Sequence, residues 1–250
     1  MRDIGFSTGA LAKSDVRKAL RLSRGLGTGA VEYSALRFEE LAPLVEFLLK
    51  EGPGDYRYSS FHAPSQFKPE DEKAVVELLW RLIERHSMHI VVHPDVISDH
   101  ALWRLFGTHL CVENMDHRKP VGRTADELEE VFEKLPEARL CFDIGHAHEI
   151  DRSMSRAYEI LKRFRNRIAH IHASEVSDEC AHRAFSPASA AAFRKVAGMI
   201  PDDVPITLET VTPDEEIGTQ MDEAGRFSSN RRTMGIGQSL DVEAHFTVKP

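Results

Sequence analysis

Short apolar runs alternate along the chain with longer stretches in which apolar residues recur at a helical spacing. Apolar runs of about four to eight residues bounded by turn residues are typical of buried strands, and a period of roughly 3.6 is typical of amphipathic helices. The strands predicted in this way are Ile4–Ser7, Ala30–Tyr33, Tyr58–His62, His89–His93, Leu110–Glu113, Leu140–Asp143, Ile168–His172 and Ile206–Glu209. The predicted helices are Leu36–Lys50, Pro69–His86, Thr124–Leu135, Arg156–Arg165 and Ala188–Ile200.

Local signals mark several helix starts. Pro69 stands at a first-turn position and is followed by acidic residues, which favour a helix N-terminus. Thr124 and Glu127 form a capping-box pattern. Strands separated by helices indicate a parallel sheet, and near-continuous apolar strands indicate a sheet covered on both faces. The strand and helix units together predict an α/β fold, a single (β/α)8 TIM barrel over residues 1–212.

The chain after Glu209 departs from this alternation. Residues 213–250 show no clear apolar stripe of helical period, so we expect the last helix of the barrel to be short, displaced or replaced by this segment. We interpret residues 213–250 as an irregular C-terminal extension of the same domain. Its end, DVEAHFTVKP, could cover the barrel, pair with a second subunit in a homodimer, or be disordered.

Composition narrows the expected partners and setting. The formal net charge of the 250 residues is −8 and basic residues are dispersed, which argues against duplex DNA as a partner, because duplex-binding proteins usually carry a basic patch. No apolar stretch approaches the roughly 20 residues of a membrane span, and the N-terminus does not resemble a signal peptide. The three cysteines form no disulfide framework, so we expect a cytoplasmic protein.

Potential metal ligands stand at the carboxyl ends of successive predicted strands, where each apolar run gives way to Pro, Gly, Asn or Ser. Strand ends of a parallel barrel meet at one mouth, so these side chains are expected to converge. Buried carboxylates and imidazoles need partners, and divalent cations are the simplest partners for a mixed set. The candidate ligands are His62, His93, Glu113, Asp143, His146, His172, His182 and Glu209.

The candidate ligands differ in how specifically their sequence context indicates metal binding. The two histidines that directly precede Pro or Ala-Pro have a structural alternative, since each could cap a strand end. Asp143 and His146 give the most specific local signal, because a strand-end carboxylate and a histidine on the following turn can reach one site. His170 shares a strand face with His172 by the period of two and is expected deeper in the barrel.

Three further residues are candidates for substrate binding. Glu32 lies near the end of the second predicted strand, and Asn114 directly follows Glu113. His148 lies two positions after His146, and its alternatives are to face away or to support a ligand from behind.

Together these residues resemble the xylose-isomerase-like TIM-barrel superfamily, over roughly residues 1–212. Its endonuclease IV branch binds three zinc ions, and its pattern is matched here by FHAP, VVHP, VEN, CFDIGH, a histidine on the seventh strand, a loop histidine and the last glutamate. The resemblance implies that all eight candidates bind metal. The sequence departs from it at Cys180, where that branch has an aspartate two positions before the loop histidine. Cys180, Asp178 or Glu179 could take the place of that aspartate.

The ketose epimerase branch of the superfamily resembles the same barrel differently. It holds one metal with four ligands, which match Glu113, Asp143, His172 and Glu209. The histidine corresponding to His146 would then contact substrate, and HIHASE resembles that branch. The arginine that those enzymes carry six positions after the metal histidine is replaced by Asp178. A one-metal site also leaves His62 and His93 without a role.

The two branches imply different reactions with Glu113, Glu209 and His146 as the catalytic candidates. In a phosphoester hydrolase, Glu113 would bridge two metals that lower the pKa of a bound water, giving a hydroxide nucleophile, and stabilise the in-line transition state. In a sugar or sugar-phosphate isomerase or epimerase, Glu113 and Glu209 would act as an acid/base pair on opposite faces of the substrate.

The leading hypothesis is hydrolysis of a small or single-stranded phosphoester, because it gives His62, His93 and His182 a role. Zinc or manganese is the expected cofactor, with two or three ions per chain. Two other classes stay open: a multi-iron oxidase using the same pocket, and a barrel that binds metal or ligand without turnover.

Overall fold

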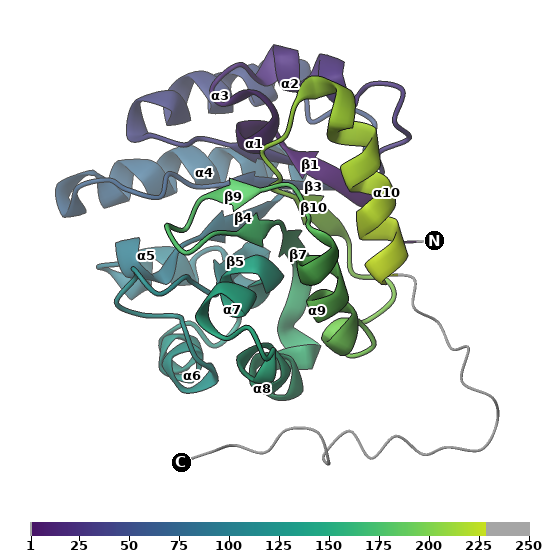
Figure 1. Ribbon diagram of the computed structural model, residues 1–250. Helices are drawn as coiled ribbons and strands as arrows, with labels where there is room; N and C mark the ends of the chain where they lie inside the picture. Colours follow the sequence, from purple (N-terminus) through teal and green to yellow (C-terminus); the bar gives the residue numbers. More distant parts are fainter. Residues whose placement is uncertain (1, 229–250) are drawn as a thin grey trace.

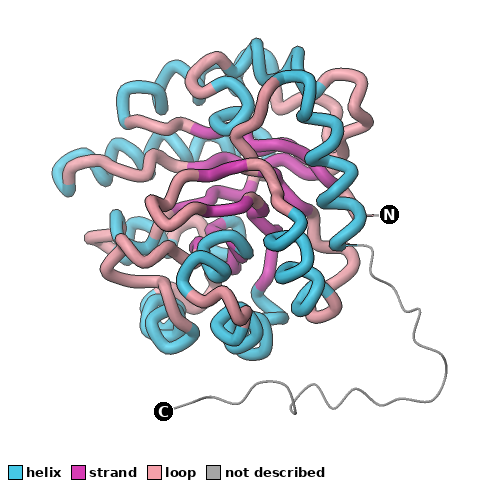
Figure 2. The backbone as a smooth tube through the Cα atoms, in the orientation of Figure 1, coloured by secondary structure: helices cyan, strands magenta, loops and turns pink. Residues whose placement is uncertain are grey.

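Residues 2–228, which the computed structural model describes, form a closed parallel barrel surrounded by helices (Figures 1 and 2). Hydrogen-bonded neighbours around the barrel follow the order β1-β10-β7-β6-β5-β4-β3-β2. The predicted (β/α)8 TIM barrel is therefore confirmed. Its strands are β1 (Ile4–Ser7), β2 (Ala30–Ser34), β3 (Tyr58–His62), β4 (His89–Val92), β5 (Leu110–Glu113), β6 (Arg139–Asp143), β7 (Ile168–Ala173) and β10 (Ile206–Leu208).

Helices connect the strands and cover the outside of the barrel. Each of the five predicted helices forms close to its predicted position. Half of the predicted capping box forms: the side chain of Thr124 accepts a hydrogen bond from the backbone N–H of Glu127, but the Glu127 carboxylate accepts from Arg123 N instead of Thr124 N. The helices are α1 (Thr8–Ala12), α2 (Val16–Ser23), α3 (Phe38–Glu51), α4 (Glu72–His86), α5 (His100–Arg104), α6 (Ala125–Lys134), α7 (Ile144–Ile150), α8 (Ser155–Phe164), α9 (Pro187–Ala197) and α10 (Ile217–Ser228).

Shorter elements lie in the connections. Single turns of 3-10 helix cover Pro69–Asp71, Pro94–Val96, Gly107–His109, Arg165–Arg167 and Asp214–Glu216. After β7 the chain forms a small antiparallel hairpin of β8 (Glu175–Val176) and β9 (His182–Arg183), which stands apart from the barrel sheet. This hairpin carries the loop histidine of the candidate metal set. None of the helices in residues 2–228 combines the length and apolar character of a membrane span.

Helix α10 forms within the segment that the sequence analysis interpreted as irregular, and it packs beside α9 against β1 and β10 (Figure 1). Its buried side chains are Ile217, Gln220, Ala224 and Phe227, at spacings of three and four. The stripe was missed because a glutamine and an alanine fill two of its positions. Gln220 is accommodated because its Oε1 accepts a hydrogen bond from Phe185 N, at 2.8 Å. The predictions made for residues 229–250, including the homodimer contact, lie outside the described residues.

The main hydrophobic core lies between the barrel and its helices. Apolar faces such as Leu41, Val45 and Leu48 of α3 are completely buried there. The interior of the barrel is different in composition. Val91 and Cys111 belong to a small separate group of buried residues, and each stands two positions before a candidate ligand, His93 just after β4 and Glu113 at the end of β5. The barrel interior is thus apolar in part and becomes polar towards the carboxyl ends of the strands.

Candidate metal centre

Strand register brings the candidate ligands to one mouth of the barrel. Asp143 on β6 pairs with His172 on β7, and His172 pairs with Thr207 on β10. Glu209 follows two residues after Thr207, and its backbone N–H donates to Ala173 O. Parallel strands that end together place these side chains within reach of one another, as expected for the active-site end of such a barrel.

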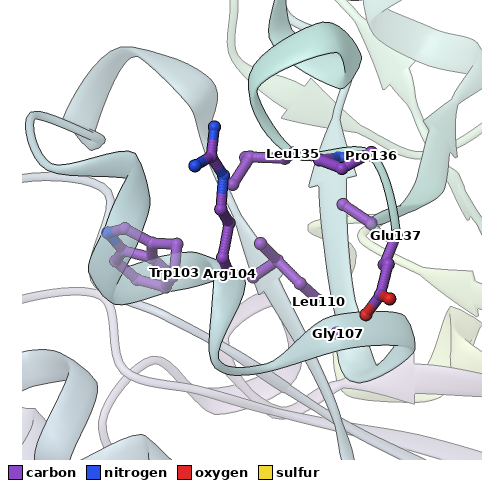
Figure 3. A pocket seen from close by; sticks show the side chains of 8 residues that line it. Trp103, Arg104, Gly107, Leu110, Leu135, Pro136 and Glu137 are labelled. Atoms are coloured by element: carbon purple, nitrogen blue, oxygen red, sulfur yellow. The ribbon is translucent and has the colours of Figure 1, made fainter.

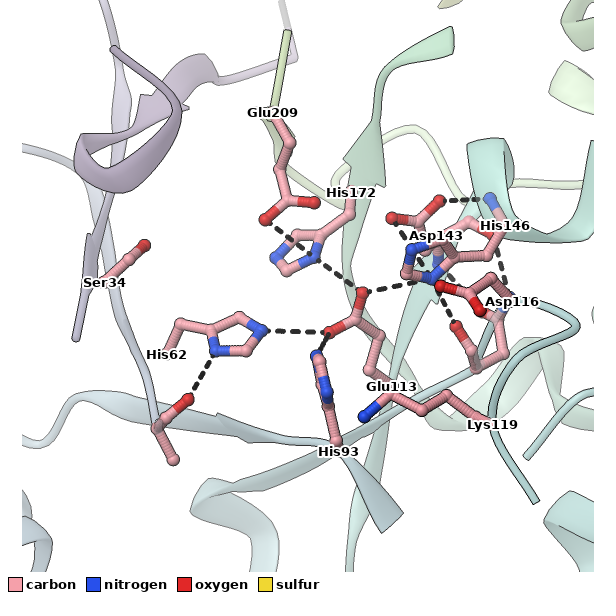
Figure 4. A network of polar contacts seen from close by, with 12 residues as sticks. Ser34, His62, His93, Glu113, Asp116, Lys119, Asp143, His146, His172 and Glu209 are labelled. Atoms are coloured by element: carbon pink, nitrogen blue, oxygen red, sulfur yellow. Dashed lines mark hydrogen bonds and ion pairs between the residues drawn. The ribbon is translucent and has the colours of Figure 1, made fainter. Parts of the chain in front are cut away.

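Glu113, at the end of β5, lies at the centre of the cluster (Figure 4). Its Oε2 is 3.1 Å from His62 Nε2 and 3.3 Å from His93 Nε2. Its Oε1 is 3.3 Å from His172 Nδ1 and 3.5 Å from His146 Nδ1. The two oxygens of one carboxylate therefore face two different pairs of histidines.

The remaining candidate ligands extend the same cluster. Asp143 Oδ2 lies 3.6 Å from His146 Nδ1. Glu209 lies between two histidines, with Oε1 3.6 Å from His172 Nδ1 and Oε2 3.5 Å from His182 Nδ1. The structure thus brings all eight sequence-predicted ligands into one connected network.

Two overlapping sets within the network have the spacing of metal ligands. Each residue in a set offers one nitrogen or oxygen, and these atoms lie within 4.8 Å of one another. The larger set consists of Glu113, Asp143, His172 and Glu209. The smaller set consists of His62, Glu113 and His172. Because Glu113 and His172 belong to both sets, the residues form adjoining ligand groups.

The crowding of charge perturbs the pKa values of the carboxyl groups in opposite directions. Burial opposes ionisation of Glu113, but the surrounding histidines outweigh it and hold its pKa well below the usual range. Burial and the neighbouring carboxylates raise the pKa of Asp143 to about 6 and that of Glu209 to about 7. The histidines respond to the same carboxylates: burial lowers the pKa of His62, but Glu113 outweighs burial and raises it to about 9. Several carboxyl and imidazole groups therefore compete for few protons.

The donor set fits divalent metal ions. Asp143 Oδ2 and His93 Nδ1 are among the polar atoms in residues 2–228 that are buried without a hydrogen-bond partner. A buried carboxylate oxygen without a partner is costly, and a coordinated cation would relieve that cost. Imidazole nitrogen with carboxylate oxygen is a ligand mixture that suits Zn²⁺, Mn²⁺ or Fe²⁺.

Glu32 lies inside the barrel, below the cluster. It is completely buried, and its Oε2 lies 3.0 Å from His172 Nε2 and accepts a hydrogen bond from Ser60 Oγ at 2.9 Å. His170 lies beside it, with Nε2 3.4 Å from the same oxygen, and its Nδ1 shares a 2.6 Å hydrogen bond with the Tyr58 hydroxyl. His170 is thus deeper than His172, as predicted. These contacts hold the ring of His172 from behind and leave Glu32 no exposed surface.

Asn114 and His148, the other predicted substrate contacts, have different surroundings. Asn114 is 1% exposed, its Nδ2 donates to Asp143 O, and its Oδ1 accepts from Asp143 N, both at 2.8 Å. Its side chain is therefore occupied in joining the ends of β5 and β6. His148 packs edge-on against Phe193 of α9, and its Nδ1 lies 3.2 Å from Arg152 Nη1. The structure does not bring His148 into the cluster.

The turn between β8 and β9 also differs from the sequence prediction. Asp178 forms an exposed ion pair with Arg152 at 2.6 Å, and Glu179 lies 3.5 Å from Arg183. Cys180 is buried, and its Sγ lies 3.5 Å from His117 Nδ1. In the described part of the chain, none of the three residues proposed to replace the expected aspartate has a side-chain hydrogen bond or ion pair with His146 or His182. Their contacts turn them away from that pair, although the two histidine rings themselves are 5.4 Å apart.

The loop between β5 and α6 contributes charged residues that the sequence analysis did not single out. Asp116 is 2% exposed and lies beside His146 in Figure 4. Although burial opposes its ionisation, hydrogen bonds from Arg118 hold its pKa well below the usual range. The charge of Lys119 acts on His93, and its Nζ forms a 2.8 Å ion pair with Asp95. The loop has no hydrophobic period, so only its position directly after VEN could have drawn attention to it.

Two cavities lie elsewhere on the described part of the chain. One, of about 260 Å³, is lined by Trp103, Leu110 and Leu135 (Figure 3). Leu110 is the first residue of β5, so this cavity is at the opposite end of the barrel from the ligands. The other, of about 390 Å³, is lined in part by His148 and Arg152. Neither cavity is lined by one of the eight candidate ligands.

The sequence of residues 95–229, more than half of the chain, matches the family model of the xylose isomerase-like TIM barrel. The chain belongs to this family. No curated protein shows significant sequence similarity to it. The family assignment agrees with the resemblance drawn from the strand-end residues.

Solved structures of other members of this fold are similar over most of their length. A D-tagatose 3-epimerase-like protein is 17% identical, with 91% of this chain and 97% of that chain covered and a TM-score of 0.65. A 3-keto-D-glucoside 4-epimerase from E. coli is 12% identical, with coverages of 91% and 99% and a TM-score of 0.62. Endonuclease IV from Thermus thermophilus is 17% identical, with coverages of 90% and 98% and a TM-score of 0.59. At these identities the likeness establishes the fold that this xylose isomerase-like chain shares with them.

Proposed function

We propose that this protein is a divalent-metal-dependent hydrolase of small or single-stranded phosphoesters. The observation that carries the proposal is the arrangement around Glu113, whose two oxygens face different histidines. Oε2 faces His62 and His93, and Oε1 faces His172. A carboxylate with separate ligands on each oxygen suits a bridge between two ions, and paired ions are typical of enzymes that displace groups at phosphorus.

Two ions held there would supply Lewis-acid stabilisation of a phosphoryl group and would lower the pKa of a coordinated water. The protein's own residues would fix the ligands. Glu32, itself held by the Ser60 hydroxyl, contacts the far side of His172, and Asn114 holds the backbone of Asp143. Groups that orient metal ligands in this way commonly change metal affinity by about 10–100-fold when removed.

Glu209 is the ligand carboxylate best placed to meet substrate. Its side chain is 15% exposed, compared with 1% for Glu113 and 0% for Asp143. It therefore lies at the solvent side of the cluster, where a proton could be passed to or from a bound molecule.

The proposed substrate class follows from the net charge of the chain and from the replacement of a sugar-binding arginine near the site. The net charge of −8 disfavours long duplex DNA. Asp178 stands where the resembling epimerases have a sugar-binding arginine, and its side chain pairs with Arg152 at the surface. A compact phosphoester therefore fits better than a ketose.

Epimerisation of a sugar or sugar phosphate is the second candidate. It is favoured by the tight set of Glu113, Asp143, His172 and Glu209, which is complete for one ion without any other residue. Glu113 and Glu209 both lie against His172 and could serve as a pair of acid/base groups around one bound ion. Similar structures that carry epimerase names support this reading to the same degree that endonuclease IV supports the first.

One experiment separates the two. We would measure metal content and assay the purified chain with Mn²⁺ or Zn²⁺ on bis(4-nitrophenyl) phosphate, on a single-stranded oligonucleotide and on a ketohexose. The variants are His62→Ala and His93→Ala, with His100→Ala on α5 as the matched control.

Hydrolysis predicts at least two ions per chain and loss of phosphodiesterase activity by more than about 100-fold in both test variants, because they remove ligands rather than supporting groups. His100→Ala should keep wild-type activity. One ion per chain, with ketose epimerisation unaffected by either test variant, would transfer the assignment to the second candidate.

A further inference from the structure

Three segments meet beside the mouth of the barrel in a second group of metal-ligating side chains. His117 comes from the β5–α6 loop, Glu149 from α7, and Cys180 from the turn between β8 and β9. Their ligand atoms lie within 4.8 Å of one another. None of the three residues belongs to the Glu113 cluster, and the proposed reaction assigns them no role.

The contacts converge on one atom, His117 Nδ1. Glu149 Oε1 is 2.5 Å from it, and Cys180 Sγ is 3.5 Å from it. A ring nitrogen carries at most one proton, so it cannot donate to the carboxylate and the sulfur with equal effect. The three donor atoms lie within 4.8 Å of one another, a spacing from which they could coordinate one cation in place of these hydrogen bonds.

The surrounding structure fixes these donors while leaving access from solvent. The side chain of Glu149 is 6% exposed, and its Oε2 accepts a hydrogen bond from His117 N at 3.2 Å. Cys180 is 6% exposed, and its backbone N–H donates to Ser177 O at 2.8 Å within the turn. The side chain of His117 is 55% exposed. Two donors are thus held in the protein, and the third lies at the surface, where an ion and a water ligand could enter.

The chemical types of the donors indicate which ion would bind. Thiolate sulfur, imidazole nitrogen and carboxylate oxygen together are a set that Zn²⁺ accepts in tetrahedral geometry, with water in the fourth position. Hard cations such as Mg²⁺ and Ca²⁺ prefer oxygen alone. Arg118 lies nearby, but its Nη2 and Nε are bonded to Asp116 at 2.8 and 3.1 Å, so that its charge is paired.

We propose that His117, Glu149 and Cys180 form a separate zinc site outside the barrel centre. An ion there would tie the β5–α6 loop to α7 and to the β8–β9 turn. The first of these carries Asp116 and Lys119, and the last leads into His182, so the site would hold two sides of the mouth in place. The proposal does not depend on which reaction the barrel centre catalyses.

Co²⁺ provides a direct test, because a cysteine thiolate bound to Co²⁺ gives a charge-transfer absorption in the near ultraviolet that oxygen and nitrogen ligands do not. The full chain would be stripped of metal and titrated with Co²⁺. We expect this band in the wild type, in Glu113→Gln and in Cys141→Ser, the last being the matched control because Cys141 lies beside His172 in the barrel.

The band should disappear in Cys180→Ser. In His117→Ala, the apparent affinity for Co²⁺, followed by the same band, should fall at least tenfold. Each variant should bind one Zn²⁺ fewer per chain by elemental analysis. His117 is exposed, so its variant keeps the test valid if Cys180→Ser does not fold. Absence of the band in the wild type, its persistence in Cys180→Ser, or its loss in Cys141→Ser would overturn the proposal. Loss of the band in Glu113→Gln would do so as well, since that variant tests the barrel centre alone.

Discussion

Replacing Asn114 with alanine would test whether this residue positions a ligand or contacts substrate. The substitution removes two 2.8 Å hydrogen bonds to the backbone of Asp143, one to its carbonyl and one from its N–H. Both residues are essentially inaccessible to water, so both backbone groups would be left unpaired. An unpaired buried group costs about 1–3 kcal/mol, so we expect the free energy of unfolding to fall by about 2–4 kcal/mol.

The same substitution would loosen the ligand itself, because Asp143 is held at the end of β6 by these bonds. We expect the affinity for Mn²⁺ or Zn²⁺ to fall by about 10–100-fold, the usual effect of removing a group that orients a ligand. Asn114→Asp keeps the acceptor for the Asp143 N–H but loses the donor, so its effect should be intermediate.

The assay combines urea unfolding of the metal-free protein with calorimetric titration of the metal. Asn166→Ala, at an exposed asparagine, is the control and should change stability by less than about 0.5 kcal/mol. If Asn114→Ala kept wild-type stability and metal affinity and only raised KM, the positioning role would be refuted and a substrate contact favoured.

Three further predictions concern stability. Glu72→Ala should lower the free energy of unfolding by about 3 kcal/mol in urea titrations, because the buried carboxylate accepts hydrogen bonds from Trp103 Nε1 and Ser98 N. The control, Glu70→Ala at an exposed position, should leave stability unchanged. Equal effects of the two substitutions would contradict this account. Burial lowers the pKa of His89 from 6.5 to about 4, so as the pH falls this imidazole is protonated in the unfolded chain before it is protonated in the folded protein. Stability from this group is complete above pH 6.5 and is lost as the pH falls towards 4, by about 2 kcal/mol at pH 5. A His89→Asn variant with an unchanged pH profile would argue against this. Finally, metal at about 100 times its Kd should add about 2.7 kcal/mol to the free energy of unfolding, and a chelator should abolish this stabilisation. A Glu113→Gln variant that kept the stabilisation would exclude Glu113 as a ligand.

The fold and the ligand set could be predicted because each left a periodic or positional signal. Apolar runs ended at a histidine or carboxylate, and the closure of parallel strands converts that regularity into proximity. Asp143 and His172 are far apart in sequence, but their strands pair in register at exactly those positions in the barrel.

Register is also the reason why Glu32 was misplaced. Its strand position pairs with Ser60, whereas His62 pairs with Ser34, two residues further along. Glu32 therefore lies one layer deeper than the ligands, and apolar periodicity cannot reveal which layer a strand residue occupies. His148 was uncertain for a related reason: on α7 it is two positions from His146, and such residues do not share a helix face.

The loop residues could not be predicted at all. Asp116 and Lys119 reach the mouth through the path of a loop without periodicity, and Cys180 faces His117 because of the turn between β8 and β9. These positions are set by tertiary packing, for which the sequence alone gives no local signal.

The buried contacts of Glu32, His170 and Tyr58 restrict how this barrel can change during evolution or engineering. An ordinary core tolerates exchange among apolar residues of similar volume, but here each member is fixed by a directional bond to the next. Substituting one of them with an apolar residue would leave its neighbours unsatisfied and would release His172 at the same time. Thermostable variants should therefore be sought in the outer helices, because repacking the interior would trade metal affinity for stability.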